Sequence, residues 1–154
     1  MGKEHHYSAT IEWTGNNGTG TDDYRHYERS HVIRIPNKPD IQGSSDAPFR
    51  GDITKHNPED FLLSSLSVCH MLWYLHLCAD AVVTAYLDRP TGVLTQTENG
   101  SGKFTSVTLN PLVTVTSQDM IERAEALHKK ANEFCFIANS VNFPVGHKPV
   151  IVTA

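Results

Sequence analysis

The chemistry of this 154-residue chain is most distinctive at its three cysteines, Cys69, Cys78 and Cys135. A thiolate is a strong nucleophile, but an unperturbed thiol with a pKa of about 8.5 is only a few per cent ionised at neutral pH, and burial raises the pKa further. Cys69 lies about three turns into a predicted apolar helix, beyond the reach of the helix dipole. A reactive Cys69 therefore requires a nearby cation. The alternative is a buried cysteine that packs as a small hydrophobic residue.

On the N-terminal side of Cys69, Arg50 is the nearest basic residue in the sequence apart from Lys55 and His56, and it lies in the segment that enters the helix. A guanidinium stays charged in a partly dry pocket, where a lysine loses its proton more readily. Lowering the pKa of a thiol by about 2–3 units requires roughly 3–4 kcal/mol from such a partner. Taken alone, Arg50 is equally well explained as a solvated loop charge.

The helix that must position Cys69 is predicted from Asn57 to Cys78. Asn57 can cap it, Pro58 suits its first position, and Glu59 places negative charge in its first turn. Its apolar side chains point to nearly every side, so we predict a core helix buried on most sides. The stretch is too short and too interrupted by Ser and His for a membrane span.

The remaining elements follow from alternation, turns and helical spacing. We predict strands at 5–14, 24–35, 81–86, 93–97, 103–116 and 150–153, with loops at 36–48 and through Pro144 and Pro149. Asn110-Pro111 indicates a bulge or an edge position within its strand. A second helix begins at the N-cap Ser117 and carries Cys135 and Ala138. This order predicts one α+β domain over residues 1–154.

The amino-acid composition excludes some classes of function. Apolar residues make up 39% and charged residues 19%, which is typical of a globular protein, and the net charge of −4 provides no basic surface for nucleic acid. No secretory signal is recognised, and three cysteines do not form a closed disulfide framework. We therefore expect a cytoplasmic protein, in which a disulfide is transient and functional.

Three segments together resemble the OsmC/Ohr family of thiol-dependent hydroperoxide reductases: FRG (49–51), NPEDFLLSSLSVCH (57–70) and EFCFIANSVNFPV (133–145). The resemblance covers nearly the whole chain. It implies an OsmC-like fold, with antiparallel strands around the central helix, and an intertwined homodimer with its active sites at the subunit interface. It also implies that Cys69 is the peroxidatic thiol, that Cys135 is the resolving thiol, and that the two form a disulfide.

The same resemblance implies that Glu59 pairs with an active-site arginine, which Arg50 matches best, with Arg34 and Arg25 as alternatives. His70 follows the peroxidatic cysteine where an aromatic residue is common, which indicates a subgroup with a different pocket. The implied partners are an organic hydroperoxide and a dithiol reductant such as a lipoyl-bearing protein or a small thiol. The implied role is oxidative-stress defence, without a metal or an organic cofactor.

Four apolar residues are candidates for a pocket that favours organic peroxides over hydrogen peroxide: Phe61, Leu66, Trp73 and Phe136. For each of them the alternative is plain core packing.

Glu59 and Cys69 are ten residues apart, or about 15 Å along a straight helix. They can serve one site if the helix breaks near Ser64-Ser65. They can also do so if the helices of two subunits run antiparallel and place Glu59 of one beside Cys69 of the other. We predict the second arrangement.

Cys78 lies about two and a half turns beyond Cys69, on nearly the opposite side, so we interpret it as a core residue. His70, His76 and Cys78 could suggest zinc, but the sequence has no C-x-x-C or H-x3-H, and we predict no metal site. Two other functions remain open: a non-enzymatic protein that binds a small apolar molecule, and a redox sensor that oxidises once and signals through a partner.

Overall fold

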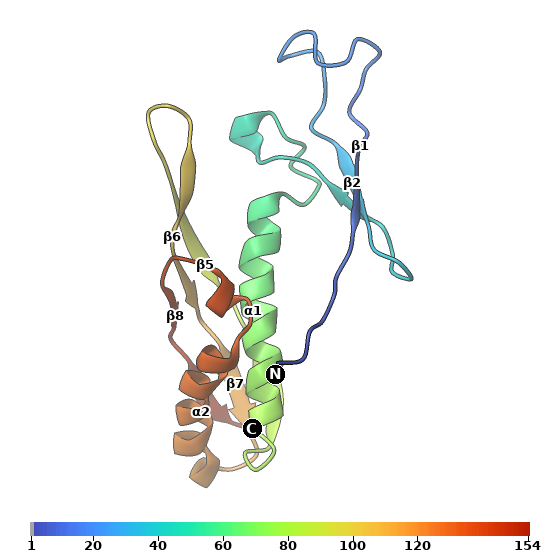
Figure 1. Cartoon of the computed structure of the whole chain (residues 1–154). Coiled ribbons are helices and arrows are strands. Elements are labelled where there is room, and N and C mark those ends of the chain that lie inside the picture. The colour runs from blue at the N-terminus through green and yellow to red at the C-terminus, as the bar shows by residue number, and fades with distance from the viewer. Residues whose placement is uncertain (1) are drawn as a thin grey trace. The chain divides into compact units, whose positions relative to one another are not determined.

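Helix α1 (Pro58–Leu77) is the longest element of the computed structural model, which describes residues 2–154 (Figure 1). The side chain of Asn57 accepts a hydrogen bond from the Asp60 amide at 2.8 Å, and the Asp60 carboxylate accepts one from the Asn57 amide at 3.3 Å. This reciprocal cap satisfies two backbone donors at the start of the helix. The predicted cap is confirmed, and the helix continues without a break through Ser64 and Ser65.

Helix α1 buries one stripe rather than most of its circumference. Leu66, His70 and Tyr74 recur every four residues and are buried, whereas Val68 is 48% exposed and Leu72 is 59% exposed. The prediction of a helix buried on most sides is therefore wrong for a single chain. The cause is that side chains from residues 81–154 pack on one side of α1 and leave the opposite side in contact with solvent.

The chain divides into two compact units, one up to Phe61 and one from Leu62 to Ala154. The single domain over residues 1–154 stays a prediction. The first unit contains a three-stranded antiparallel sheet in the order β1 (Thr10–Trp13), β2 (His31–Arg34) and β3 (Ile41–Gly43), followed by a short 3-10 helix, η1 (Ala47–Phe49).

Two sequence predictions for the first unit are corrected. All four residues of β1 are exposed, so its alternating pattern does not produce a half-buried strand. The segment predicted as a loop, 36–48, contains β3, which pairs with β2 from His31 to Ile33. The strands predicted at 5–14 and 24–35 are real but shorter.

The second unit contains two three-stranded sheets. One has the order β4 (Val83–Leu87), β7 (Leu112–Val115), β9 (Val150–Thr153), and the other has the order β5 (Thr91–Gln96), β6 (Gly102–Leu109), β8 (Val145–His147). β6 pairs antiparallel with β5, and β7 with β4, but β8 and β9 run parallel to their partners. The sheets are mixed, so the expectation of antiparallel strands holds only in part.

Each strand of one sheet leads directly into a strand of the other, and a proline stands at each of the three junctions: Pro90, Pro111 and Pro149. Proline has no N–H to donate to a neighbouring strand, so each proline interrupts the ladder at this level. The predicted strand 103–116 is consequently two strands divided at Asn110-Pro111. The Asn110 amide donates to the Asp88 carboxylate at 2.7 Å, and the second oxygen of Asp88 accepts from Ser67 of α1 at 2.5 Å.

Helix α2 (Ile121–Phe134) follows the 3-10 helix η2 (Gln118–Met120), and a third one, η3 (Ala138–Ser140), follows α2. Ser117 precedes η2 but its side chain makes no capping hydrogen bond, so its predicted capping role is not observed. α2 packs beside the C-terminal half of α1 (Figure 1). The core there joins residues from both helices, from the turn after α1 and from β7: Tyr74, Cys78, Ala81, Val113, Val115, Ala124 and Ala131. Cys78 is a core residue, as predicted.

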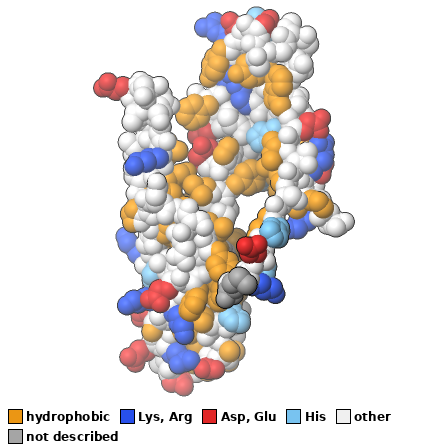
Figure 2. Space-filling model, viewed as in Figure 1, with side chains coloured by type: hydrophobic (Ala, Val, Ile, Leu, Met, Phe, Trp, Pro, Cys, Tyr) orange, Lys and Arg blue, Asp and Glu red, His pale blue; other side chains and the backbone are white. Residues whose placement is uncertain are grey.

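Charged side chains of both signs are mixed on the surface (Figure 2), as the near-balance of acidic and basic residues leads us to expect. Figure 2 shows Lys and Arg side chains interspersed with Asp and Glu side chains on the face that it draws. Within residues 2–154, no helix combines the length and the hydrophobicity that crossing a bilayer requires. The α+β class is confirmed.

Candidate active site

Cys69 lines a cavity of about 510 Å³ on the exposed side of α1. Its walls come from one face of α1 and from a single residue beyond α2: Ser65, Val68, Cys69, Leu72, Trp73, His76 and Phe136. Residues 65, 69, 72 and 76 follow the helical repeat, so they form one stripe along the helix. A volume of this size lies within the range of roughly 300–1,000 Å³ that is common for small-molecule sites.

Trp73 is the centre of the apolar wall. Its ring stacks on Phe134 with centroids 5.2 Å apart, and it meets Phe136 edge-to-face at 5.5 Å and His76 edge-to-face at 5.8 Å. Such aromatic contacts favour one orientation of each ring. The cavity therefore presents a structured hydrophobic wall beside the thiol of Cys69, which suits an organic molecule better than a small polar one.

The thiol of Cys135 lies beside the thiol of Cys69. Cys135 is only 1% exposed, and its burial, together with a smaller contribution from the neighbouring Cys69 thiol, raises its pKa to about 11. The Ala138 amide donates to the Cys135 sulfur at 3.4 Å. Neither cysteine forms a disulfide in the structure. A half-buried thiol thus faces the cavity, with a fully buried thiol next to it.

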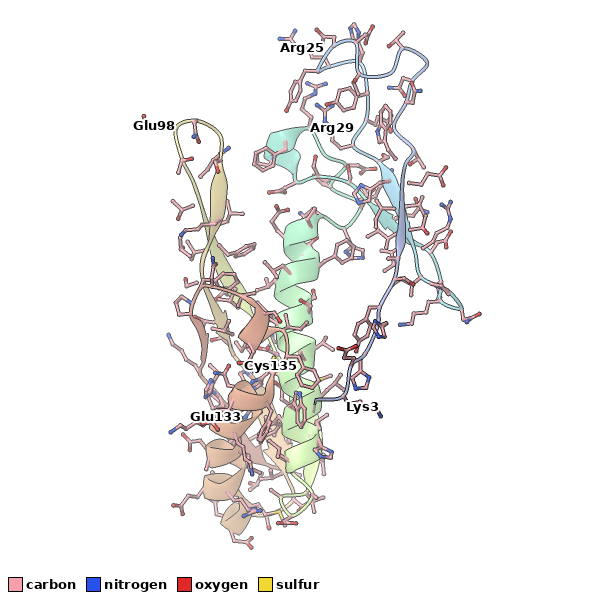
Figure 3. All side chains as sticks on the ribbon, viewed as in Figure 1. Lys3, Arg25, Arg29, Glu98, Glu133 and Cys135 are labelled. Atoms are coloured by element: carbon pink, nitrogen blue, oxygen red, sulfur yellow. The ribbon has the colours of Figure 1, made fainter. Side chains whose placement is uncertain are left out.

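The prediction that Cys135 lies within the second helix is wrong. Cys135 is the residue that caps the C-terminus of α2. Its backbone is extended, with φ −66° and ψ 109°, so the chain leaves the helix at this residue (Figure 3). The helical spacing of Phe134, Cys135 and Ala138 does not reveal this turn, because η3 begins at Ala138 and continues the pattern.

The four predicted pocket residues separate into two groups. Trp73 and Phe136 line the cavity with Cys69. Leu66 is fully buried against Val107 and Leu109, so for Leu66 the core-packing alternative is correct. Phe61 belongs to the first unit, where its ring lies 5.7 Å from His56. Sequence reasoning missed four lining residues: Ser65, Val68, Leu72 and His76. Ser65, Leu72 and His76 share a helix face with Cys69 by their spacing, which is the signal that could have found them.

Arg50 lies in the first unit, at the C-terminus of η1, with a left-handed backbone of φ 62°. Its guanidinium lies 5.9 Å from the centre of the Tyr24 ring, and it lines a polar cavity of about 250 Å³ with Arg29 and Asp52 among the walls. Figure 3 labels Arg29 in this unit. Among the ion pairs of residues 2–154, none joins Arg50 to Glu59.

The two alternative arginines, Arg34 and Arg25, differ in their ion pairs and exposure. Arg34 forms ion pairs with Glu12 and, at 3.3 Å, with Asp40. Arg25 is exposed in the loop before β2. Arg34 is thus already neutralised by two carboxylates, which favours Arg50 over it as a partner for an anion.

The Cys69 cavity contains a single residue that can become a cation, His76, among the side chains that line it in the described part of the chain. The charge partner that a reactive thiolate requires is not found in this wall. No cluster of three or more His, Cys, Asp or Glu within residues 2–154 has an arrangement suited to a metal ion.

A buried histidine pair joins the two helices next to the thiols. Nε2 of His70 lies 2.9 Å from Nδ1 of His128, within hydrogen-bonding distance, and both rings are at most 1% exposed. Burial, with a smaller contribution from nearby histidines, lowers the pKa of His70 to about 4 and that of His128 to about 3. In the sequence, His70 is a possible metal ligand and the sign of a different pocket, but no residue pattern indicates its partner, which is 58 residues away.

The chain is similar to known proteins in family and in fold. The family described as OsmC-like protein matches residues 51–148. An OsmC-like protein of unknown function from Vibrio cholerae O1 biovar eltor has a TM-score of 0.84 and 29% identity, with 96% of this chain and 100% of that chain covered. No curated protein matches.

Two further solved structures share the fold at lower identity. An organic hydroperoxide resistance protein from Elizabethkingia anophelis has a TM-score of 0.70 and 18% identity, with both chains fully covered. An organic hydroperoxide resistance protein from Legionella pneumophila has a TM-score of 0.66 and 18% identity, with 98% of this chain and 100% of that chain covered.

Proposed function

The chain belongs to the OsmC-like protein family, and from this premise we propose that it reduces organic hydroperoxides to alcohols with Cys69 as the attacking thiol. The observation that carries the proposal is the half-buried Cys69 in an apolar cavity with the buried thiol of Cys135 beside it. The names of the two hydroperoxide resistance proteins of the same fold support the choice of substrate. We place the reaction in the cytoplasm, as a defence against oxidative stress.

In the proposed reaction, the Cys69 thiolate attacks the distal oxygen of ROOH. The S–O bond forms as the O–O bond breaks, the sulfur loses two electrons and becomes a sulfenic acid, and the alkoxide takes up a proton and leaves as ROH. The apolar wall around Trp73 holds the organic group of the substrate near the sulfur.

Cys135 then attacks the sulfenic sulfur. A Cys69–Cys135 disulfide forms, and the hydroxyl leaves with the thiol proton as water. An external dithiol, such as a lipoyl group, reduces the disulfide by thiol exchange and restores both thiols. The high pKa of Cys135 suits this second role, because a thiol that remains protonated does not compete with Cys69 for the peroxide.

The charge partner of the thiolate comes, in this proposal, from a second copy of the chain. The cavity wall contains no guanidinium among its described residues, and α1 is unbroken, so Glu59 lies about 15 Å along the helix from Cys69 of the same chain. A homodimer in which Arg50 and Glu59 of one subunit approach Cys69 of the other supplies the missing charge. The exposed apolar side of α1 is a surface that such a partner can cover.

A peroxide-consumption assay with dihydrolipoamide as the reductant tests the function. Wild-type protein is expected to turn over cumene hydroperoxide, Cys69→Ser to lose all turnover, and Cys135→Ser to complete one oxidation and then stop. The matched control is Cys78→Ala, because Cys78 is buried in the core of the same helix region and is expected to leave turnover unchanged. No turnover with any alkyl or aryl hydroperoxide overturns the proposal and favours a protein that binds an apolar molecule. A single oxidation that dithiols do not reverse favours a sensor.

A further inference from the structure

The pair formed by His70 and His128 is a buried group that the proposed mechanism does not use. It stands where α1 crosses α2, and it is flanked by Tyr74, whose ring stacks on His128 with centroids 3.8 Å apart. The Tyr74 hydroxyl donates to the Ala124 carbonyl at 3.0 Å. The two helices are therefore tied by directional polar contacts inside an otherwise apolar core.

These contacts are continuous with the two thiols. His70 directly follows Cys69 on α1, and Cys135, the buried residue at which α2 ends, comes seven residues after His128. Moving along α2 from Ala124 to His128 to Cys135, the contacts on α1 move in the opposite direction, from Tyr74 to His70 to Cys69. The helices therefore run antiparallel here. The contact between the two thiols is the last of three contacts between these segments, after Tyr74–Ala124 and His70–His128.

A hydrogen bond limits sliding between two helices more strictly than an apolar contact does. It requires a donor and an acceptor within about 0.3 Å of the ideal separation and in line, whereas two leucine side chains remain in contact over a range of positions. Buried polar pairs are known to select one register between helices at some cost in stability. The other ring nitrogens, Nδ1 of His70 and Nε2 of His128, have no hydrogen-bond partner in the described part of the chain. Leaving these buried polar atoms unpaired lowers the stability of the fold.

We propose that the His70–His128 hydrogen bond is a positioning device that holds Cys69 and Cys135 in register for disulfide formation. The inference rests on the proposed function, in which these two thiols form a disulfide. It assigns to His70 and His128 a role in the second step of the reaction and none in the attack on the peroxide.

The hydrogen bond also dictates the protonation of both rings. A neutral imidazole carries one N–H, and one proton must lie between Nε2 of His70 and Nδ1 of His128. If His70 donates it, both rings carry their proton on Nε2, because Nδ1 of His128 must then be free to accept. If His128 donates it, both rings carry their proton on Nδ1. The two histidines must therefore have the same tautomer.

The thiol equilibrium with glutathione tests the positioning role without any peroxide. In a Cys78→Ala background, the protein is equilibrated with mixtures of reduced and oxidised glutathione, and the Cys69–Cys135 disulfide is measured by alkylation and mass spectrometry. We expect His70→Leu/His128→Leu to lower the disulfide equilibrium constant at least tenfold while its melting temperature is unchanged or raised. An equilibrium constant within twofold of the unsubstituted protein overturns the proposal. A purely structural role predicts instead that stability falls together with the equilibrium constant, and that result also overturns it.

Nitrogen-15 NMR of the wild-type protein at pH 7 is a second test that needs no variant. We expect both buried imidazoles to be neutral, to have the same tautomer and to show a scalar coupling across the N–H···N bond. A spectrum in which one of the two rings is protonated on Nδ1 and the other on Nε2 overturns the proposal, even if the leucine variant fails to fold. Failure of the proposed function is recognised separately, since it appears as absent peroxide turnover in a wild-type protein whose tautomers and glutathione equilibrium are as expected.

Discussion

The thiol of Cys135 is buried beside the thiol of Cys69, but only Cys69 opens to the cavity. Burial raises the pKa of Cys135 to about 11, so at pH 7 this thiol is protonated. Two neighbouring sulfurs are thus distinguished by access and by charge. The order of their reactions follows from this difference.

Alkylation measures that order. With iodoacetamide at pH 7, we expect Cys69 to be modified at least tenfold faster than Cys135, because only the thiolate reacts and only Cys69 is accessible. Peptide mass spectrometry over time gives both rates in one sample. Buried Cys78, whose pKa burial also raises, is the internal control and is expected to react slowly. Faster modification of Cys135 contradicts the assigned roles.

The buried histidines predict acid sensitivity of the fold. Their pKa values are lowered in the folded protein, to about 4 for His70 and about 3 for His128, from about 6.5 in the unfolded chain. The unfolded chain therefore binds more protons below pH 6.5, so stability is fully present above that pH and is lost as the pH falls through 6.5 toward 4. Thermal unfolding followed by circular dichroism should show a melting temperature that decreases over this window.

The variant His70→Leu/His128→Leu is the control for this pH dependence. It lacks both groups, so its melting temperature should change less between pH 6.5 and pH 4.5 than that of the wild-type protein. Each kcal/mol of lost stability corresponds to roughly 2–4 °C for a chain of this size. Equal slopes in the two proteins would show that other groups dominate the acid response.

Trp73 should determine affinity for bulky hydroperoxides. We expect Trp73→Ala to raise KM for cumene hydroperoxide about tenfold, because removing the ring removes apolar contact that substrate and transition state share, and kcat should change little. The effect on hydrogen peroxide should be within twofold, since that molecule has no organic group. Steady-state kinetics with both peroxides provide the test. The control Leu94→Ala alters an exposed leucine of the β5–β6 hairpin, away from the lining residues.

Asp88 should be important for stability rather than for catalysis. Its two oxygens accept hydrogen bonds from Ser67 of α1 and from the Asn110 amide, at the level where both sheets are interrupted. We expect Asp88→Ala to lower the free energy of unfolding by about 1–3 kcal/mol, because partly buried donors lose their acceptor. Chemical denaturation measures this loss. Glu98→Ala, at the exposed tip of the hairpin labelled in Figure 3, should change stability by less than about 0.5 kcal/mol.

Local patterns were sufficient for several features. The Asn57 cap, the long helix through Cys69, the strand at 150–153 and the core position of Cys78 were predicted correctly because each depends on residues close in sequence or on hydrophobic spacing. The combination of FRG, NPE with Cys69 ten residues later, and Cys135 was also sufficient to indicate the family, since these residues are read directly from the chain.

Other features depend on which segments meet in space. The parallel pairing of β8 and β9, the interruption of three strands at one level by Pro90, Pro111 and Pro149, and the cavity wall beside Cys69 arise from contacts between distant segments. Periodicity shows which side chains are apolar, but it does not show which stripe of α1 the rest of the chain covers. Leu66 and Trp73 are both apolar residues of the same helix, yet one is fully buried and the other lines the cavity.

By itself the sequence determined the family, the α+β class and the principal helix, and it identified the two cysteines of the proposed reaction, because these depend on residue type and local spacing. Only the tertiary structure decided that Cys135 ends its helix, that its thiol lies beside that of Cys69, and that His70 meets His128. The physical reason is that a thiol contact and an N–H···N bond each depend on atoms separated by more than fifty residues. Their separation is set by the packing of α1, α2 and the sheets together.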